Sequence, residues 1–182
     1  MDNTVVHMKL NYADKNDVHI IGLKGRPEYY PVPDEEQDVL FYIQRNQNLN
    51  TVVYQLNKRA SGGVDMDNPI NVYWKQYAGD GSKKQINLLQ RKLAYGYNSK
   101  PINTNTIEFE IVYYPEFKMY LSITENGEAA VLARLCGEWA VLSNIYVFAD
   151  EFGVFPDVKY IELYGDRKSD GLPVYQKLIV SA

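Results

Sequence analysis

The sequence predicts a mainly β protein, an antiparallel β-sandwich or a partly open barrel of about ten strands with one short helix. Apolar and polar residues alternate over short stretches along the whole chain, which is typical of strands with one buried face. Glycine, proline, asparagine and aspartate separate these stretches, as expected of turns. With 182 residues, of which 46% are apolar, the chain can enclose one core, so we expect a single domain over residues 1–182.

The predicted strands are spread over the whole chain. The first half contains candidates at residues 5–10, 18–23, 39–44, 51–56 and 70–77. The second half adds 106–114, 118–124, 129–136, 139–148, 158–164 and 174–180. This many short strands favours a sandwich or a barrel, because these architectures leave few exposed sheet edges.

Turn residues predict how the later strands connect. Asn126-Gly127 suits a type I′ turn, so strands 118–124 and 129–136 should form a hairpin. Gly137-Glu138 suits a type II′ turn into the following strand, which would extend the hairpin to a three-stranded meander. Asp170-Gly171 is expected to lie in the turn that joins the last two strands.

Residues 83–95 follow helical spacing instead. The apolar positions that recur at intervals of three and four are Ile86, Leu89, Leu93 and Tyr97. Ser82 with Gln85 forms a capping box, and Gly96 supplies a stop. A helix this short needs packing to be stable, so we expect its leucine face to lie against the sheet or across an open barrel end.

An acidic stretch that follows three prolines marks the best candidate for a boundary. Asp34 to Asp38 come directly after Pro27, Pro31 and Pro33, and this composition favours extended or loop structure. We expect residues 1–30 to form an N-terminal hairpin extension of a core at residues 39–180. The acidic run could bind a cation or a basic partner, but most such runs solvate a loop.

Composition excludes several classes of function. A net charge of −4 and a pI near 5.2 argue against nucleic acid as a partner, because phosphate binding needs a basic face. A single cysteine leaves no intrachain disulfide. No segment is long and apolar enough to span a bilayer. The opening MDNTVVHMKL lacks the pattern of a signal peptide, so we expect a cytoplasmic protein; a leader removed earlier would leave a secreted or periplasmic one.

No motif of a familiar enzyme class is present, and we predict no catalytic residue, metal site or cofactor. His7 and His19 fall in the N-terminal hairpin, where packing is the favoured role. Cys136 ends an apolar strand and is expected to be an inert thiol. Asp65 and Asp67 resemble the start of a calcium loop, but the glycine and glutamate that complete it are missing, so a solvated turn is favoured.

Two further functional hypotheses stay open. Glu108 and Glu110 share one face of strand 106–114, as the paired carboxylates of a hydrolase acting on a glycan or an ester would, and as any solvent-facing strand does. The second hypothesis is a structural subunit that assembles through exposed edge strands.

Tyrosine is the most unusual feature of the composition, with 16 residues against 6 Phe and 2 Trp. Its ring suits a half-buried pleated face, and it also suits a groove for a sugar or a lipid, so composition leaves both readings open. In strand 70–77, alternation places one set of large side chains, Val72, Trp74 and Gln76, on one face and another, Tyr73, Lys75 and Tyr77, on the other. We infer that one face is core and that the other is covered or binds something.

This strand provides the candidate ligand site. A lysine between two tyrosine rings suits an anionic or sugar ligand through charge-assisted hydrogen bonds and stacking. The residues that we expect to form the site are Arg45, Tyr73, Trp74, Lys75, Tyr77, Arg91 and Tyr95. The alternative is a lysine whose chain simply packs between tyrosines.

Three segments of the same region resemble a known family. FYIQRNQNLNTVVYQLN (41–57), NPINVYWKQYA (68–78) and LLQRKLAYGY (88–97) are similar, in order and spacing, to the bacterial domain of unknown function 4833 (DUF4833). The resemblance covers residues 39 to about 180. It implies a compact β-rich domain, assigns no functional residue, and leaves an exported location open.

We therefore expect a non-enzymatic binding or interaction module. Its Tyr/Trp/Lys-rich surface would bind a small amphipathic or anionic ligand, or a protein partner. The sequence does not predict the oligomeric state.

Overall fold

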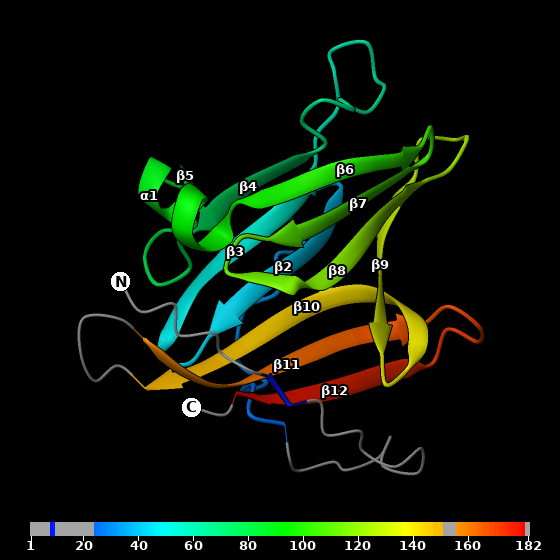
Figure 1. The fold of residues 1–182 in the computed structure, drawn as a ribbon. Coiled ribbons are helices and arrows are strands. Elements are labelled where there is room, and N and C mark those ends of the chain that lie inside the picture. Colours follow the sequence, from blue (N-terminus) through cyan, green and yellow to red (C-terminus); the bar gives the residue numbers. More distant parts are fainter. Residues whose placement is uncertain (1–7, 10–23, 151–155, 181–182) are drawn as a thin grey trace, which may run out of the picture.

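A curled β-sheet makes up most of the computed structural model, which describes residues 8–9, 24–150 and 156–180 (Figure 1). Its strands are β1 (Met8–Lys9), β2 (Val39–Arg45), β3 (Asn48–Leu56), β4 (Ile70–Lys75), β5 (Lys83–Gln85), β6 (Tyr97–Asn103), β7 (Thr106–Ile111), β8 (Tyr114–Ile123), β9 (Ala129–Leu135), β10 (Glu138–Asp150), β11 (Asp157–Arg167) and β12 (Pro173–Val180). A short helix consists of α1 (Leu88–Gln90) and a π-helical turn, η2 (Arg91–Tyr95). The predicted mainly β class is confirmed.

The long strand β10 organises the sheet. One of its edges pairs with β9 over residues 138–141 and then with β2 over residues 144–147. The other edge pairs with β11, which in turn pairs with β12. Two branches, β5-β4-β3-β2 and β9-β8-β7-β6, therefore start from the same edge of β10. The β2–β10 pair is parallel, which corrects the prediction of a purely antiparallel sheet.

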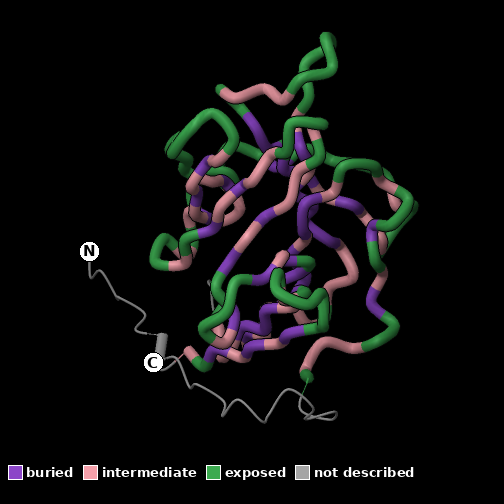
Figure 2. Tube along the Cα trace, turned by 90° about the vertical axis from the view of Figure 1, so that its right-hand side faces the viewer, coloured by how far each residue is buried: buried purple, intermediate pink, exposed green. Residues whose placement is uncertain are grey.

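The two branches curl toward each other and enclose the core, as expected of a partly open barrel (Figures 1 and 2). Phe41 of β2 stacks on Tyr54 of β3 at 4.4 Å and lies 6.3 Å from Phe109 of β7. At the open side, the Tyr97 hydroxyl of β6 accepts a hydrogen bond of 3.1 Å from the backbone N–H of Ile70 in β4. Side chains, rather than a backbone ladder, thus bridge the ends of the curl.

The predicted meander β8-β9-β10 is confirmed, but its turns differ from the predicted types. Between β9 and β10, Cys136 (φ 51°) and Gly137 (φ 76°) both have positive φ, so the turn is type I′ on Cys136-Gly137 rather than type II′ on Gly137-Glu138. Between β8 and β9, Gly127 has φ 79° and Asn126 does not have a positive φ. The Gly127 N–H donates to the Thr124 carbonyl, as in a type I turn followed by a left-handed glycine. Asp170-Gly171 lies between β11 and β12 as predicted.

The helix is shorter than predicted, and its leucine face is not buried. Residues 83–85 pair with β4 as strand β5, and the capping box is formed by Asn87 and Gln90, not by Ser82 and Gln85. Leu89 and Leu93, which should have packed on the sheet, are 66% and 60% exposed, whereas Ile86 of the same predicted face is buried.

Contacts of the helix's last residue explain its orientation. The ring centroids of Tyr95 and Trp74 lie 5.2 Å apart in an edge-on contact. The backbone carbonyl of Tyr95 accepts a 2.7 Å hydrogen bond from the buried Tyr54 hydroxyl. These contacts orient the turn so that Tyr95, rather than the leucines, faces the sheet.

One strand of the sheet was not predicted, and two predicted strands lie wholly or mostly outside the residues that the structure describes. Strand β6 was not predicted, and most of its residues are exposed; Lys100 and Pro101 suit the edge position that it occupies. Of the expected N-terminal strands 5–10 and 18–23, only Met8–Lys9 is described, and it pairs antiparallel with the end of β12. His7 and His19 lie outside the described residues.

The type I′ turn yields a test of the β9–β10 hairpin. Because Gly137 has φ 76° and no atom within 4 Å of an added Cβ, Gly137→Ala adds backbone strain without a clash. We expect a loss of about 1 kcal/mol in the free energy of unfolding, measured by urea denaturation. Gly63→Ala is the matched control, because Gly63 is exposed, equally uncrowded and not at positive φ. Equal effects of the two substitutions would contradict the turn assignment.

Candidate functional site

The face of the sheet opposite the core carries polar side chains and tyrosines. Strand register places Tyr42 beside Asn144, Gln44 beside Tyr146, and Tyr146 beside Glu162. Because side chains alternate between faces, these residues point away from core residues such as Phe41 and Ile43. The outer face, as we call it, comprises Tyr42, Gln44, Thr51, Tyr73, Lys75, Asn144, Tyr146, Tyr160, Glu162, Tyr164, Tyr175 and Lys177.

Residues 24–38, the covering segment, lie across this outer face. In the part of the chain that is described, one backbone–backbone hydrogen bond joins the segment to the sheet, from the Leu56 N–H to the Asp38 carbonyl. Its other contacts with the sheet use side chains. The acidic run forms a loop, as expected, and its residues are exposed except for Glu36, which is half-buried and pairs with Lys75 and Lys83.

At one end of the segment, Glu162 holds the covering backbone. Its side chain is fully buried. The carboxylate accepts hydrogen bonds from the N–H groups of Gly25 and Arg26, at 2.5 and 3.1 Å, and from the hydroxyls of Tyr164 and Tyr175, at 2.6 and 2.9 Å. A buried carboxylate is tolerated only when its lone pairs are used in this way. A side chain at Gly25 would overlap the Tyr160 hydroxyl, so glycine is required here.

In the middle of the segment, the Gln44 side chain of β2 forms hydrogen bonds with polar groups of the segment. The Gln44 amide is buried; its oxygen accepts a 2.7 Å hydrogen bond from Arg26 Nε, and its nitrogen donates to the Pro31 carbonyl at 2.5 Å. The Tyr30 ring packs edge-on against Tyr146 at 5.9 Å. The segment is thus recognised through both its backbone and its side chains.

At the other end, two acidic residues meet a buried lysine. Lys75, only 7% exposed, lies 3.0 Å from a Glu35 oxygen and 2.9 Å from a Glu36 oxygen. Lys83 pairs with the second Glu36 oxygen, and the Tyr77 hydroxyl donates to Glu35 at 2.7 Å. We call these five residues the lysine–glutamate cluster.

Their pKa values follow from these contacts. The hydrogen bond from Tyr77 and the ion pair with Lys75 lower the pKa of Glu35. Burial disfavours the Glu36 carboxylate, but Lys83 and Lys75 outweigh burial and lower its pKa. The hydrogen bond to Glu36 raises the pKa of Lys75. All three groups are therefore held in their charged forms.

The structure brings three of the predicted site residues together, Tyr73, Lys75 and Tyr77. The anion that they face is carried by the chain itself, because Glu35 and Glu36 fill the position expected for a ligand. Of the two alternatives left open for the second face of this strand, covered or binding something, the structure shows a covered face, with Tyr73 and Lys75 buried. Sequence reasoning missed these two partners, although the acidic run after three prolines was the signal.

The remaining predicted residues lie elsewhere. Trp74 and Tyr95 contact each other on the opposite face of β4. The Arg45 carbonyl accepts a hydrogen bond of 3.0 Å from the Tyr30 hydroxyl. Arg91 lines a separate, open pocket of about 550 Å³ together with Tyr97 and other polar residues.

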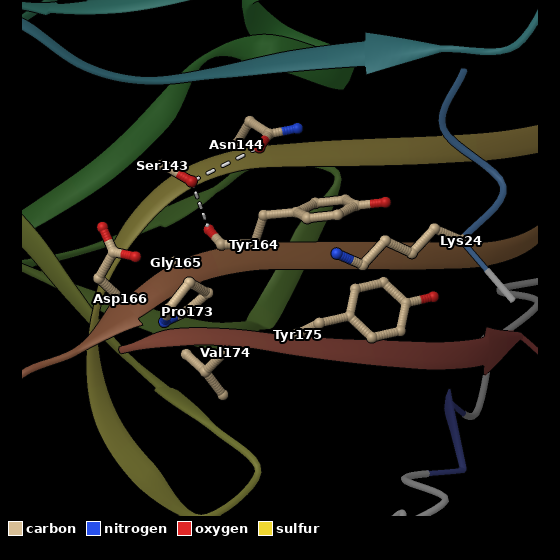
Figure 3. Close-up of a pocket in the computed structure, with 9 residues that line it drawn as sticks. All are labelled: Lys24, Ser143, Asn144, Tyr164, Gly165, Asp166, Pro173, Val174 and Tyr175. Atoms are coloured by element: carbon tan, nitrogen blue, oxygen red, sulfur yellow. Dashed lines mark hydrogen bonds between the residues drawn. The ribbon is translucent and has the colours of Figure 1, made fainter. Parts of the chain in front are cut away.

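A second pocket, of about 220 Å³, lies between β10, β11 and β12 beside Lys24 (Figure 3). The Lys24 ammonium lies 5.4 and 5.5 Å from the ring centroids of Tyr164 and Tyr175. Asn144, 6% exposed, lines the same pocket, and its Nδ2 has no hydrogen-bond partner among the described residues. Figure 3 shows Asp166 at the end of the pocket away from Lys24.

In this pocket the Lys24 ammonium lies beside the uncharged rings of Tyr164 and Tyr175. Burial, and then the charge of Glu162 and the hydrogen bonds to it, raise the pKa values of Tyr164 and Tyr175, so both phenols stay protonated and donate to Glu162. Their ring faces are left to attract the ammonium. Within the described chain, no ion pair of Lys24 with a carboxylate is found. Sequence reasoning did not identify this site, because Lys24 comes from a segment far from β11 and β12.

The other candidate groups have structural partners. Glu110 pairs with Lys118 at 2.9 Å, and Asp65 and Asp67 both pair with Arg59. Burial raises the pKa of the Cys136 thiol, which donates to the Tyr175 carbonyl. Among the residues described, no group of three or more His, Cys, Asp and Glu could hold a metal ion, and no helix is long and apolar enough to cross a membrane.

Comparison with known proteins gives one match. The family model named Domain of unknown function (DUF4833) matches residues 41–177. No curated protein and no solved structure matches the chain. The covering segment lies outside the matched residues.

Glu162→Gln tests the first end of the covering segment. The amide replaces one accepting oxygen with a donor that faces donors, so we expect a loss of about 2 kcal/mol in the free energy of unfolding, measured in urea. Glu116→Gln, at an exposed position of β8, is the matched control and should change stability by less than about 0.5 kcal/mol. A Glu162 variant as stable as the control would contradict the contacts described.

The lysine–glutamate cluster predicts a pH dependence. Since the folded pKa values of Glu35 and Glu36 are lowered, their stabilisation is present above the unfolded pKa, about 4.3, and is lost as pH falls through the folded values. The folded pKa of Lys75 is raised. The stabilisation that Lys75 provides is therefore present below its unfolded pKa, about 10.4, and is lost as pH rises through its folded pKa.

We therefore expect the wild type to exceed the double variant Glu35→Gln, Glu36→Gln in stability between about pH 5 and 9, with the difference vanishing as the pH falls through the lowered folded pKa values of the two carboxyls. Urea denaturation of both proteins across this range measures it. A difference that does not change with pH would show that the carboxylate charges contribute nothing.

Proposed function

The chain belongs to the DUF4833 family, and we propose that it is a non-enzymatic binding module that takes a small anionic ligand in the pocket beside Lys24. The observation that carries this proposal is the pair of donors at the pocket: an ammonium between two tyrosine rings and a buried amide, Asn144 Nδ2, without a partner among the described residues. Buried polar groups are normally hydrogen-bonded, so an unused donor beside a pocket supports a ligand that supplies the acceptor.

The donor set and the size of the pocket define the ligand class. An ammonium and an amide N–H suit a carboxylate, which accepts charge-assisted hydrogen bonds. About 220 Å³ is less than a drug-sized ligand needs, so the ligand is small. Asp166 lies at the opposite end (Figure 3), where it would accept a hydrogen bond from the ligand. A small carboxylic acid that also carries an amine or a hydroxyl fits these features best.

The residues of the pocket favour binding over catalysis. Nucleophilic catalysis needs a nucleophile with a base in reach. The Ser143 hydroxyl donates to the Tyr164 carbonyl at 3.0 Å, and the lining residues include no histidine or cysteine.

A ligand screen tests this proposal. The probes are amino acids and small mono- and dicarboxylates, with inorganic phosphate as a comparison, and the readout is isothermal titration calorimetry. We expect at least one carboxylate to bind, and Lys24→Ala to weaken it by about tenfold or more, which corresponds to the loss of one charge-assisted hydrogen bond.

Lys168→Ala is the matched control, because Lys168 is an exposed lysine of the β11–β12 loop that does not line the pocket. The proposal fails if no carboxylate binds, or if both lysine variants bind the same ligand with equal affinity.

A further inference from the structure

The covering segment has the properties of a bound peptide rather than of a sheet element. It contributes no strand, and it lies outside the residues that match the family. The sheet holds it at two separate places, Glu162 at its start and Lys75 near its end. The residues of the outer face beneath it lie within the range that matches the family, 41–177.

Recognition of the segment uses groups that a peptide offers and a small molecule does not. Gln44 donates to the Pro31 carbonyl at 2.5 Å, and Gln55 donates to the Gln37 carbonyl at 2.6 Å. The carbonyls of Pro27, Val32 and Pro33 accept hydrogen bonds from N–H groups within the segment, which therefore contains short turns. Gln44 and Gln55 hold two of the remaining backbone carbonyls.

Charge supplies the second part of recognition. Lys75 and Lys83 present two ammonium groups on adjacent strands, and both contact Glu36. The hydroxyl of Tyr77 adds a donor to Glu35, and that of Tyr73 lies 3.5 Å from Glu36. A segment with two consecutive acidic residues after a proline satisfies all four groups.

A single residue, Asp38, connects the segment to β2. It has φ 56°, a left-handed conformation that aspartate adopts more readily than most non-glycine residues. Its carbonyl and its carboxylate are held by the Leu56 N–H and by Lys58, each at 2.9 Å.

We propose that the part of the outer face formed by β2, β3, β4 and β5 is a docking surface for an acidic, proline-containing segment of a partner protein, and that residues 24–38 occupy it as a built-in competitor. This surface is distinct from the small-ligand pocket and goes beyond the function proposed above. Charge complementarity and the amide contacts to backbone carbonyls determine the chemistry of the partner.

The test adds the segment back as a separate molecule. The probe is a fluorescein-labelled synthetic peptide of residues 24–38, and the readout is fluorescence anisotropy with the full-length chain at low salt. In the double variant Glu35→Lys, Glu36→Lys, the built-in segment is repelled by Lys75 and Lys83, while the docking surface itself is unchanged. We expect this variant to bind the peptide at least tenfold more tightly than the wild type does. A peptide with the same two substitutions should bind neither chain.

Three outcomes would overturn the proposal: no binding to the variant while its circular dichroism and thermal transition stay intact, equal binding to both chains, or equal binding of both peptides. If the variant does not fold, Glu36→Gln in the full-length chain replaces it, with the same comparison and a smaller expected gain. Light scattering tests whether a second copy of this chain is the natural occupant of the surface. A wild-type dimer that is lost in the double variant would assign the surface to that second copy and contradict the proposal of a foreign partner.

Discussion

A buried carboxylate fixes the arrangement of the outer face. Glu162 is fully inaccessible to solvent, and an ionised group in that position requires donors on every free lone pair. Two of them are tyrosine hydroxyls of β11 and β12, and two are backbone N–H groups of Gly25 and Arg26. The sheet also supplies the Lys177 ammonium, 3.9 Å from the carboxylate, and the covering segment completes the set of donors with its two N–H groups. Tyrosine is the aromatic residue that such a face needs, because its ring packs and its hydroxyl donates.

The covering segment links the two candidate sites. Lys24, at its beginning, completes the small pocket between Tyr164 and Tyr175, and Glu36, near its end, fills the surface beside Lys75. If the segment leaves the sheet, the pocket loses its cation. Binding of a small anion beside Lys24 and docking of a partner on β2 to β5 therefore oppose each other, and each would weaken the affinity for the other by the same factor.

Local signals in the sequence predicted most strands, since alternation between apolar and polar residues depends only on which face is buried. They failed where tertiary contacts override local preference. Residues 83–85 suit a helix by spacing, yet they pair with β4, and Tyr95 rather than the leucines faces the sheet because Tyr54 and Trp74 hold it. The parallel β2–β10 pair joins strands far apart in the chain, and no local pattern encodes that choice.

The candidate site was predicted in part for the same reason. Alternation within one strand correctly grouped Tyr73 with Lys75 and Tyr77. It gave no information about what lies above them, so the pairing of the Glu35 and Glu36 carboxylates with Lys75 was not predicted. Lys24 and Asn144 come from distant segments, and only the fold brings them to one pocket.

Amide hydrogen exchange of the wild-type protein, measured by NMR at Gly25 and Arg26, tests the central claim most directly. If the Glu162 carboxylate holds the covering segment, both amides are protected to an extent similar to that of the neighbouring β11 and β12 amides, and the two exchange together. Exchange of both amides at the rates of an unprotected chain, while β11 and β12 stay protected, would contradict the account.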